Sequence, residues 1–296
     1  MTNKHIPVLL QDVLAAFSEI EKISNNPFFL DGTLGGGGHT EELLAAHATL
    51  KIVGCDYDQT AIDKVSTHLS KEVTSGRLEF FHGNFSEALN GEREFEGMLL
   101  DLGYSSNQLE DPEYGMSFQA KSNGPLDMRL SRPPVGLSAW DILRESTDDE
   151  LADILYVYGE IHDSRRIARN IHEAIGSGEI TNSTSSLAGF LSRIDRTKKQ
   201  SIHPATLVFQ ALRIAVNDEL RNLDEFLKKA ILRLRPSGIL AIISFHSLED
   251  RLVKRWGQNQ SEKIEALTRK PIEASEEESH ENPRSRSAKL RVYRKR

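Results

Sequence analysis

The sequence contains very little cysteine and no long hydrophobic run. Its single cysteine, Cys55, excludes an internal disulfide and a cysteine-based zinc site. No apolar stretch approaches the roughly 18 residues that a membrane helix needs, and the first residues, MTNKHIPVLLQ, lack the apolar core of a signal peptide. We therefore expect a cytoplasmic protein without membrane contacts. No group of His, Asp and Glu has the spacing of metal ligands, so we expect no required metal.

The charge of the chain is unevenly distributed. The formal net charge of -7 over 296 residues argues against a nucleic-acid partner, but residues 283–296 contain seven basic residues and no acidic one. A local basic stripe matters more to a polyanion than the total charge does. This segment is either a solvated C-terminal tail or a contact for RNA. The acidic run at 273–281 is expected to form a mobile loop.

Short apolar runs alternate with helical patterns between residues 27 and 101. The runs are continuously apolar, which is typical of parallel strands covered on both faces. We expect strands at 27–33, 50–56, 77–83, 96–101 and 236–245, and two closing strands in KIEALTR and AKLRVYR. The predicted fold class is α/β, with a mostly parallel, doubly wound sheet.

From residue 139 to about 196 only helical patterns occur, and a long helical pattern follows from 204 to about 234. This break predicts an inserted all-helical subdomain at 109–203, used for substrate recognition. Residues 1–108 and 204–296 would then form one discontinuous domain. Ser247 is the expected cap of the helix that follows the strand at 236–245, with Asp250 completing a capping box.

The most specific local motif is DGTLGGGGH at 31–39, between the first predicted strand and helix. Ligands bind outside the carboxyl ends of parallel strands, and glycines there allow a close approach of the backbone. Asp31, Glu41 and Glu42 would repel the pyrophosphate of a dinucleotide. S-adenosylmethionine fits better, because the loop N–H groups can hold its carboxylate while the acidic residues face its positive charge.

Two further strand ends carry candidate cofactor residues. Asp56 ends the second predicted strand, where an acidic residue accepts hydrogen bonds from ribose hydroxyls. This residue alone does not distinguish a methyl donor from NAD. Asn84 and Phe85 follow the third strand, where an amide and an aromatic ring could bind and cover an adenine. Phe85 is equally compatible with a core position.

After the fourth predicted strand the chain reads Asp101-Leu-Gly-Tyr104. The spacing is similar to the Asp-Pro-Pro-Tyr signature of methyltransferases that modify exocyclic amines. Such an amine is a poor nucleophile, because its lone pair is delocalised into the ring. A carboxylate and a backbone carbonyl that accept its N–H bonds can aim the lone pair at a methyl group. The alternative is that Asp101 caps the strand and Tyr104 packs.

Nine segments in order identify a family resemblance: HIPVLL (5–10), DGTLGGGGHT (31–40), HGNFS (82–86), LLDLGYSSNQLED (99–111), GMSF (115–118), GPLDMR (124–129), HPATLVFQALRIAVNDEL (203–220), ISFHSLEDRLVKR (243–255) and ENPRSRSAKLR (281–291). The chain resembles the bacterial ribosomal RNA small-subunit methyltransferase H family, also called MraW. The resemblance implies a class I, Rossmann-like methyltransferase that uses S-adenosylmethionine. It also implies N4-methylation of a cytosine in the decoding region of 16S rRNA, within the 30S particle.

The resemblance assigns residues as well. The implied cofactor contacts are Gly37, Gly38, His39, Asp56, Phe85, Asp101 and Gln108, and the implied catalytic residues are Asp101 and Tyr104. His246 is expected to be structural or to orient substrate. The candidate RNA contacts are the basic residues at 283–296, Arg165, Arg166, Arg169, Arg193, Arg196, Lys198 and Lys199, with Tyr104, Phe118 and Trp140 as stacking partners.

Several alternatives stay open from the residues alone. An RNA-binding ribosome-assembly factor with little or no methyl transfer would keep the same basic residues. An NAD-linked oxidoreductase shares the generic fold but would be expected to carry GxGxxG, which the loop at 31–39 lacks. A DNA or small-molecule methyltransferase would share the cofactor loop. The sequence leaves open whether the protein is a monomer or a homodimer.

Overall fold

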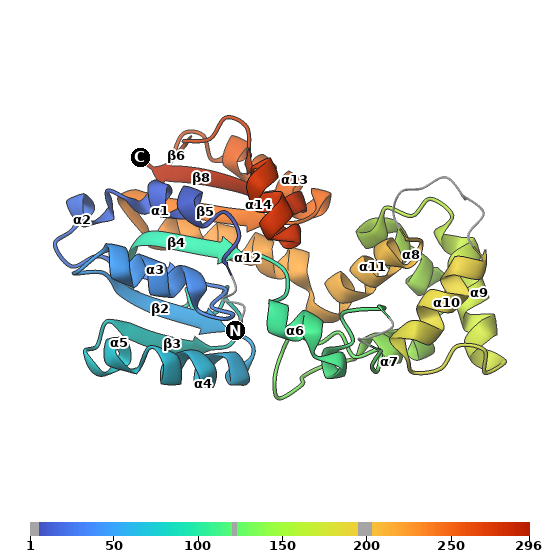
Figure 1. The fold of residues 1–296 in the computed structure, drawn as a ribbon. Coiled ribbons are helices and arrows are strands. Elements are labelled where there is room, and N and C mark those ends of the chain that lie inside the picture. The colour runs from blue at the N-terminus through green and yellow to red at the C-terminus, as the bar shows by residue number, and fades with distance from the viewer. Residues whose placement is uncertain (1–5, 120–122, 195–202) are drawn as a thin grey trace. The chain divides into compact units, whose positions relative to one another are not determined.

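The computed structural model describes residues 6–119, 123–194 and 203–296 (Figure 1). The chain forms two compact units, Met1–Gly103 with Leu220–Arg296, and Tyr104–Glu219. The second unit extends beyond the predicted insert on both sides, because Tyr104 and the residues from Ala205 to Leu212 pack into its core. That this unit recognises the substrate stays a prediction.

The first unit contains an eight-stranded sheet in the order β3-β2-β1-β4-β5-β8-β6, with β7 beside β8. Strands β1 to β5 pair in parallel, and β8 runs antiparallel to β5, β6 and β7. The predicted fold class is therefore confirmed. The strands are β1 (Phe28–Asp31), β2 (Lys51–Asp56), β3 (Leu78–His82), β4 (Phe95–Asp101), β5 (Leu234–Ser244), β6 (Ile264–Ala266), β7 (Ile272–Glu273) and β8 (Lys289–Lys295).

Helices cover both faces of this sheet, which explains why its central strands are continuously apolar. Helices α1 to α4 share one apolar core with the sheet, and α12 and α13 share the other. In Figure 1, α3 lies in front of the sheet and α12 behind it. The helices of this unit are α1 (Leu10–Phe17), α2 (Ile20–Ile23), α3 (Gly38–Ala46), α4 (Gln59–His68), α5 (Ser70–Thr74), α12 (Glu219–Arg233), α13 (Ser247–Asn259) and α14 (Glu276–Glu281).

The regular elements in the described part of the second unit are helices, as predicted, and an irregular segment lies between η1 and α7. Its helices surround a separate apolar core, and none of the described helices of the chain is long and apolar enough to cross a membrane. The helix expected from 204 to 234 is divided, because Asp218 has a left-handed φ of 52°. The elements are α6 (Ser106–Glu110), η1 (Pro112–Tyr114), α7 (Ala139–Glu145), α8 (Asp148–Gly159), α9 (Ser164–Gly176), α10 (Thr184–Ile194) and α11 (Ala205–Asn217).

The basic C-terminal segment is not a solvated tail, and the closing strands predicted in KIEALTR and AKLRVYR are confirmed as β6 and β8. Strand β8 lies between β5 and β6 and buries Leu290 and Val292. Arg291 is only 7% exposed, and its guanidinium donates two hydrogen bonds to Asp250, at 2.7 and 3.2 Å. Asp250 therefore forms an ion pair with Arg291 of β8 and is not part of a capping box.

The expected mobile acidic loop and the expected helix cap also differ in the structure. The acidic run contains the helix α14, whose Glu278 N–H donates to the side chain of Ser275. Helix α13 is capped by His246 rather than Ser247, and Glu249 accepts the backbone N–H of His246. A carboxylate that occupies this first turn satisfies N–H groups that the helix leaves unbonded.

Two arginines of β8 provide a matched test of this assignment. Arg291→Ala leaves Asp250 without its charged partner, so we expect the free energy of unfolding to fall by about 3–5 kcal/mol. Arg294→Ala removes an exposed side chain and is expected to cost about 0.5 kcal/mol or less. Urea denaturation followed by circular dichroism measures both. Equal, small effects would contradict the structural role of Arg291.

Candidate functional site

The glycine-rich loop lies between β1 and α3, at the carboxyl end of the sheet. Gly37 caps α3 in a left-handed conformation, with a φ of 77°. A Cβ on Gly37 would lie 2.9 Å from Cγ1 of Val65, and a Cβ on Gly38 would lie 2.6 Å from Cγ of Pro7. These positions need glycine because neighbouring side chains approach the loop closely. The start of α3 also presents N–H groups that suit a carboxylate.

Asp56 joins the end of β2 to this loop. Its Oδ2 accepts the Gly35 N–H at 2.7 Å, and its Oδ1 accepts the Asp58 N–H at 2.9 Å. Burial is the largest cause that raises the pKa of Asp56 to about 6, and the two backbone hydrogen bonds oppose it. Each carboxylate oxygen keeps a second acceptor position. Asp56 can therefore hold the loop and still accept hydrogen bonds from two ligand hydroxyls.

Asp31 holds the glycine loop in place through hydrogen bonds. It is 1% exposed, its Oδ2 accepts the Thr40 hydroxyl at 2.7 Å, and its Oδ1 accepts the Thr33 N–H at 3.2 Å. The Thr33 hydroxyl in turn accepts the backbone N–H of Asp101 at 2.6 Å. The Asp31 carboxylate therefore ties β1, the loop and β4 together, and its predicted position facing the positive charge of the cofactor stays a prediction.

Asp101 presents an unsatisfied acceptor at the end of β4. Its Oδ1 is buried and has no hydrogen-bond partner among the described residues. The pKa of Asp101 is raised to about 7: burial is the largest cause, the charge of Arg284 opposes it, and the negative charges of Asp31 and Glu249 add to it. A buried acceptor without a donor costs free energy, about 1–3 kcal/mol. A ligand N–H at this position would remove that cost.

His39 lies between Asp101 and the N-terminal segment. Its ring is largely buried, with Nε2 at 3.0 Å from the Val8 carbonyl oxygen and Nδ1 at 3.9 Å from Oδ2 of Asp101. A carbonyl only accepts hydrogen bonds, so Nε2 carries a proton and donates it to Val8. The predicted contact between His39 and the cofactor stays a prediction.

Residues 6–9 are held over the start of α3 by the C-terminal part of the chain. The Leu9 N–H donates to Oε1 of Glu278 at 2.7 Å, and Nδ2 of Asn282 donates to the Ile6 carbonyl at 3.1 Å. Neither Glu278 nor Asn282 belongs to the site residues that the sequence predicts. The available signal was that HIPVLL and ENPRSRSAKLR, at opposite ends of the chain, both belong to the family resemblance.

Phe85 lies near the cofactor loop with one side packed into the core. Its ring meets Phe226 edge to face, with the ring centroids 5.5 Å apart. A Cβ on Gly32 would lie 3.1 Å from Cβ of Phe85, so the loop passes close to this residue. The ring is only partly buried. Both interpretations of Phe85 from the sequence, as a core residue and as a cover for adenine, therefore remain compatible with its position.

Tyr104 and Gln108 belong to the second unit, where both have internal partners. Gln108 accepts the Ser105 N–H with Oε1 at 2.8 Å and donates from Nε2 to the Leu130 carbonyl at 3.4 Å. The guanidinium of Arg213 lies 5.1 Å from the centre of the Tyr104 ring. The proposed roles of Tyr104 and Gln108 toward target base and cofactor are untested by these contacts.

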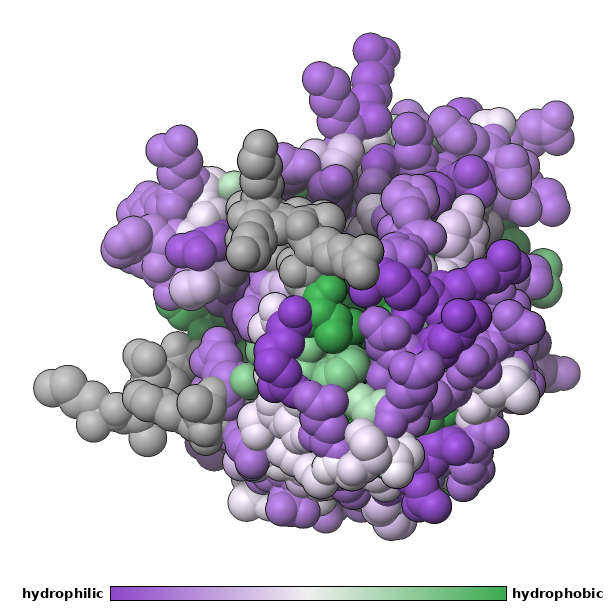
Figure 2. Space-filling view, turned by 90° about the vertical axis from the view of Figure 1, so that its right-hand side faces the viewer, coloured by the Kyte–Doolittle hydropathy of each residue, from purple (hydrophilic) through white to green (hydrophobic). Residues whose placement is uncertain are grey.

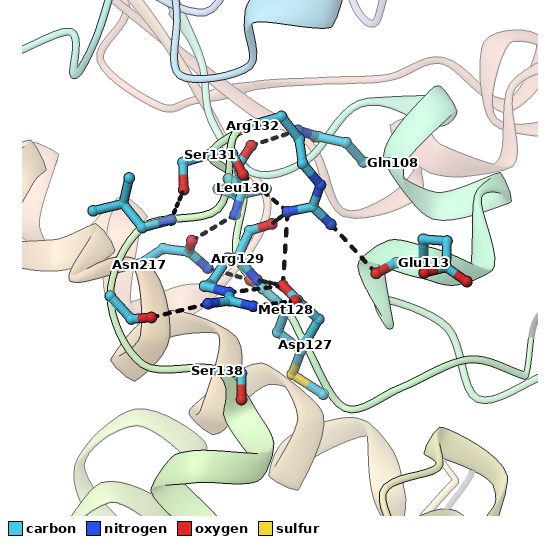
Figure 3. A network of polar contacts seen from close by, with 12 residues as sticks. Gln108, Glu113, Asp127, Met128, Arg129, Leu130, Ser131, Arg132, Ser138 and Asn217 are labelled. Atoms are coloured by element: carbon cyan, nitrogen blue, oxygen red, sulfur yellow. Dashed lines mark hydrogen bonds and ion pairs between the residues drawn. The ribbon is translucent and has the colours of Figure 1, made fainter.

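The GPLDMR segment forms a polar network in the same unit (Figure 3). Asp127 accepts hydrogen bonds from Nε and Nη2 of Arg129 at 3.1 and 2.6 Å, and lies 3.7 Å from Arg132. Asn217 accepts the Leu130 N–H and donates to the Met128 carbonyl, both with side-chain atoms. The charged and polar side chains of this segment therefore hold an irregular loop in place, and their charges are paired within the unit.

Most of the described candidate RNA contacts of the second unit have acidic or aromatic neighbours. Arg166, Arg169 and Arg193 lie within ion-pair distance of Asp163, Asp148 and Glu179, respectively. Phe118 packs against Phe209 and His203, and Trp140 is partly buried on the helical core. Arg165 is exposed, and Arg196, Lys198 and Lys199 lie outside the described residues. The face shown in Figure 2 is mostly hydrophilic around a small hydrophobic patch.

Comparison with known proteins gives long matches. A family model described as the MraW methylase family matches residues 2–296. The ribosomal RNA small subunit methyltransferase H of Prochlorococcus marinus is 44% identical over 296 residues, covering 99% of this chain and 95% of the relative. The protein of that name from Sorangium cellulosum is 41% identical over 298 residues, covering 99% and 91%.

The solved structures that resemble this chain have much lower sequence identity than these relatives. An rRNA methylase from Streptococcus thermophilus is 11% identical, with a TM-score of 0.46, and the match covers 95% of this chain and 94% of that one. The match to a methylase family confirms the predicted cofactor, S-adenosylmethionine.

Glu278 offers a test of the contact between the chain ends. Glu278→Ala removes the charged acceptor of the Leu9 N–H, a hydrogen bond with a net stabilising contribution of about 1.5–3 kcal/mol. Because residues 6–9 hold Pro7 against Gly38 and Val8 against His39, we expect the affinity for S-adenosylmethionine to fall about 5-fold. Calorimetric titration measures it. Glu277→Ala, an exposed neighbour in α14, is the control, and an equal loss in both variants would contradict the role of Glu278.

Proposed function

Because the chain belongs to the MraW methylase family, we propose that it methylates the N4 amine of a cytosine in the decoding region of 16S rRNA. The chain is a methyltransferase, and its cofactor is S-adenosylmethionine. The name shared by the curated relatives supports small-subunit rRNA as the substrate. The proposed partner is the 30S ribosomal particle, and the proposed place of action is the cytoplasm.

The residues around the glycine loop fit the cofactor. When bound, S-adenosylmethionine supplies a methyl group on a positively charged sulfur. The N–H group of Gly38 would bind its carboxylate beside His39, while Gly37, whose own N–H donates to the Leu34 carbonyl at 2.7 Å, would let the backbone approach it closely. Asp56 would accept hydrogen bonds from the ribose hydroxyls through its remaining acceptor positions. Phe85 covers the adenine. Gln108 is proposed as a further cofactor contact, and only the family resemblance supports it.

One observation carries the assignment of the catalytic residue, namely the buried Oδ1 of Asp101 without a hydrogen-bond donor. An exocyclic amine of a cytosine provides such a donor. An N–H bond held by Asp101 keeps the nitrogen lone pair out of the ring and directed at the methyl group, so the gain comes from orientation and electrostatics. Backbone carbonyls after Asp101 can accept the second N–H, and Tyr104 is proposed to position the base.

The reaction also releases a proton. Transfer of the methyl group from the cofactor sulfur to the amine nitrogen would leave that nitrogen with one proton to lose. Asp101 lies at the amine, and its pKa of about 7 makes it a competent acceptor near neutral pH. His39, with Nδ1 at 3.9 Å from Asp101, is a neighbouring base that can share this proton.

The alternative function is an RNA-binding ribosome-assembly factor with little or no methyl transfer. One experiment separates the two. Purified protein is incubated with S-adenosylmethionine carrying a labelled methyl group and with undermethylated 30S particles, with naked 16S rRNA in parallel. Mass spectrometry of the nucleosides then identifies the product. N4-methylcytidine at one site supports the proposal, whereas particle binding without transfer supports the assembly factor.

Asp101→Asn tests the proposed catalytic residue. The amide keeps the shape of the side chain but loses its charge and presents a donor where the amine needs an acceptor. We expect kcat to fall by about 100-fold to 1,000-fold, as when one transition-state hydrogen bond is removed. The affinity for 30S particles is expected to change less than about 3-fold. Asp63→Asn, an exposed site on α4, is the control. Activity of Asp101→Asn within a few-fold of wild type would overturn the assignment.

The raised pKa of Asp101 predicts a pH dependence. Only the ionised carboxylate offers two acceptors, so kcat/KM should fall about 10-fold per pH unit below pH 7 and level off above it. The charged groups that act on Asp101 are Arg284 on the short helix η3 (Pro283–Ser287), Asp31 on β1 and Glu249 on α13, and the imidazole of His39 on α3 lies 3.9 Å away.

The same pKa determines a stability effect with a defined sign. The folded protein keeps a proton on Asp101 that the unfolded chain releases, so this contribution to stability is present below about pH 4 and is lost as the pH rises through about 7. The stability of Asp101→Asn relative to wild type should therefore be more favourable at pH 8 than at pH 5. Thermal unfolding at both pH values measures this, and the reverse order would contradict the raised pKa.

A further inference from the structure

A groove lies between α12 and α13, on the face of the sheet opposite to α3. It has a volume of about 470 Å³, and its lining comes entirely from the first unit. Helix α12 leads directly into β5, and α13 begins three residues after β5 ends. Asp101 pairs with Ile243 near the end of β5. The groove therefore starts at the sheet edge that carries Asp101 and runs away from it between the two helices.

The lining of the groove combines an apolar floor with positive charge. Leu220, Leu248, Leu252 and Trp256 supply apolar surface. The cations are Lys228, Arg251 and Arg255, and the single carboxylate is Asp224, which lies within ion-pair distance of Lys228. Asn259 and Gln260 add amide groups at one end. The chain has a formal net charge of -7, whereas the charged residues that line the groove are mostly positive.

Trp256 lines this groove and carries an unsatisfied donor. Its ring meets the buried Tyr293 edge to face, with the ring centroids 5.3 Å apart and the ring planes at 90°. Its Nε1 atom is buried and has no acceptor among the described residues. A buried indole N–H in this state is unfavourable unless a partner accepts it. Arg255, one residue away, is exposed and makes no ion pair within the described chain.

We propose that this groove binds a single-stranded stretch of the RNA that flanks the target nucleotide. Lys228, Arg251 and Arg255 contact its phosphates, and a base packs on Trp256 and Leu252. A single strand is favoured because its unpaired bases are free to pack on the apolar side chains of the groove. Its phosphates can at the same time contact the cationic side chains. A helix of a protein partner would instead need a continuous apolar groove. The proposal rests on the proposed rRNA substrate.

The first test uses two adjacent residues of α13. Arg255→Glu reverses a charge in the groove, and Lys254→Glu makes the same reversal at an exposed residue that does not line it. We expect Arg255→Glu to weaken binding of naked 16S rRNA about 10-fold and to reduce the slope of log affinity against log salt by about 1. Lys254→Glu should change the affinity less than about 2-fold. Binding of S-adenosylmethionine should be unchanged in both.

The second test uses the two tryptophans of the chain, Trp140 and Trp256. In a Trp140→Phe variant the emission comes from Trp256 alone, and stacking of a base should quench it during titration with a single-stranded oligonucleotide of the decoding region. Equal effects of the two charge reversals, or unchanged emission at saturating RNA, would overturn the proposal.

Two other outcomes remain distinguishable. Loss of 30S binding by Arg255→Glu with unchanged binding of naked rRNA would assign the groove to a ribosomal protein and overturn the proposal. Absence of methyl transfer by the wild-type protein to any RNA would instead overturn the proposed function. If wild type and Arg255→Glu transferred methyl groups equally well, with equal KM for rRNA, the proposed function would stand and the proposed role of the groove would be overturned.

Discussion

The candidate site depends on the hydrogen bonds of Thr33. Its backbone N–H is held by Asp31 at the end of β1, and its hydroxyl accepts the backbone N–H of Asp101 at the end of β4. These strands are neighbours at the point where the sheet order reverses direction, which is where ligands bind in open α/β sheets. One threonine therefore sets the distance between the cofactor loop and the proposed catalytic carboxylate. Asp56 fixes the other side of the same loop through Gly35.

The two ends of the chain complete this arrangement, which makes the C-terminal segment a structural part of the site. Strand β8 extends the sheet beyond β5, and α14 then lies where Glu278 can hold the Leu9 N–H. Through Val8 and Pro7, residues 6–9 in turn contact His39 and Gly38. A substitution near residue 280 can thus change a loop near residue 38 without touching a ligand. Such coupling through a short chain of contacts is local and needs no movement of the sheet.

The sequence was sufficient for the features that depend on local pattern. Continuous apolar runs predicted the parallel strands, the change to helical patterns predicted the helical unit, and the residues of the glycine loop lie together with Asp56 and Asp101 as strand ends require. The sequence alone could not predict which residues far apart in the chain contact one another. The pattern of AKLRVYR predicted a closing strand, but nothing local shows that Arg291 meets Asp250, so its basic residues were equally compatible with a solvated tail or an RNA contact. Likewise, the run of glutamates gave no sign that Glu278 bonds to Leu9, because that contact joins residues 269 positions apart.

The buried acids of the site explain why a positively charged cofactor suits it. Asp31, Asp56 and Asp101 lie at the ends of three neighbouring strands, and burial raises the pKa of each above its ordinary value. Their ionised forms are costly in the protein alone, because burial removes solvent and the charges repel one another. A cation bound among them offsets part of that cost and lowers the pKa values again. The free energy that the fold loses by burying these carboxylates is thus recovered in binding, which couples affinity for the cofactor to the stability of the site.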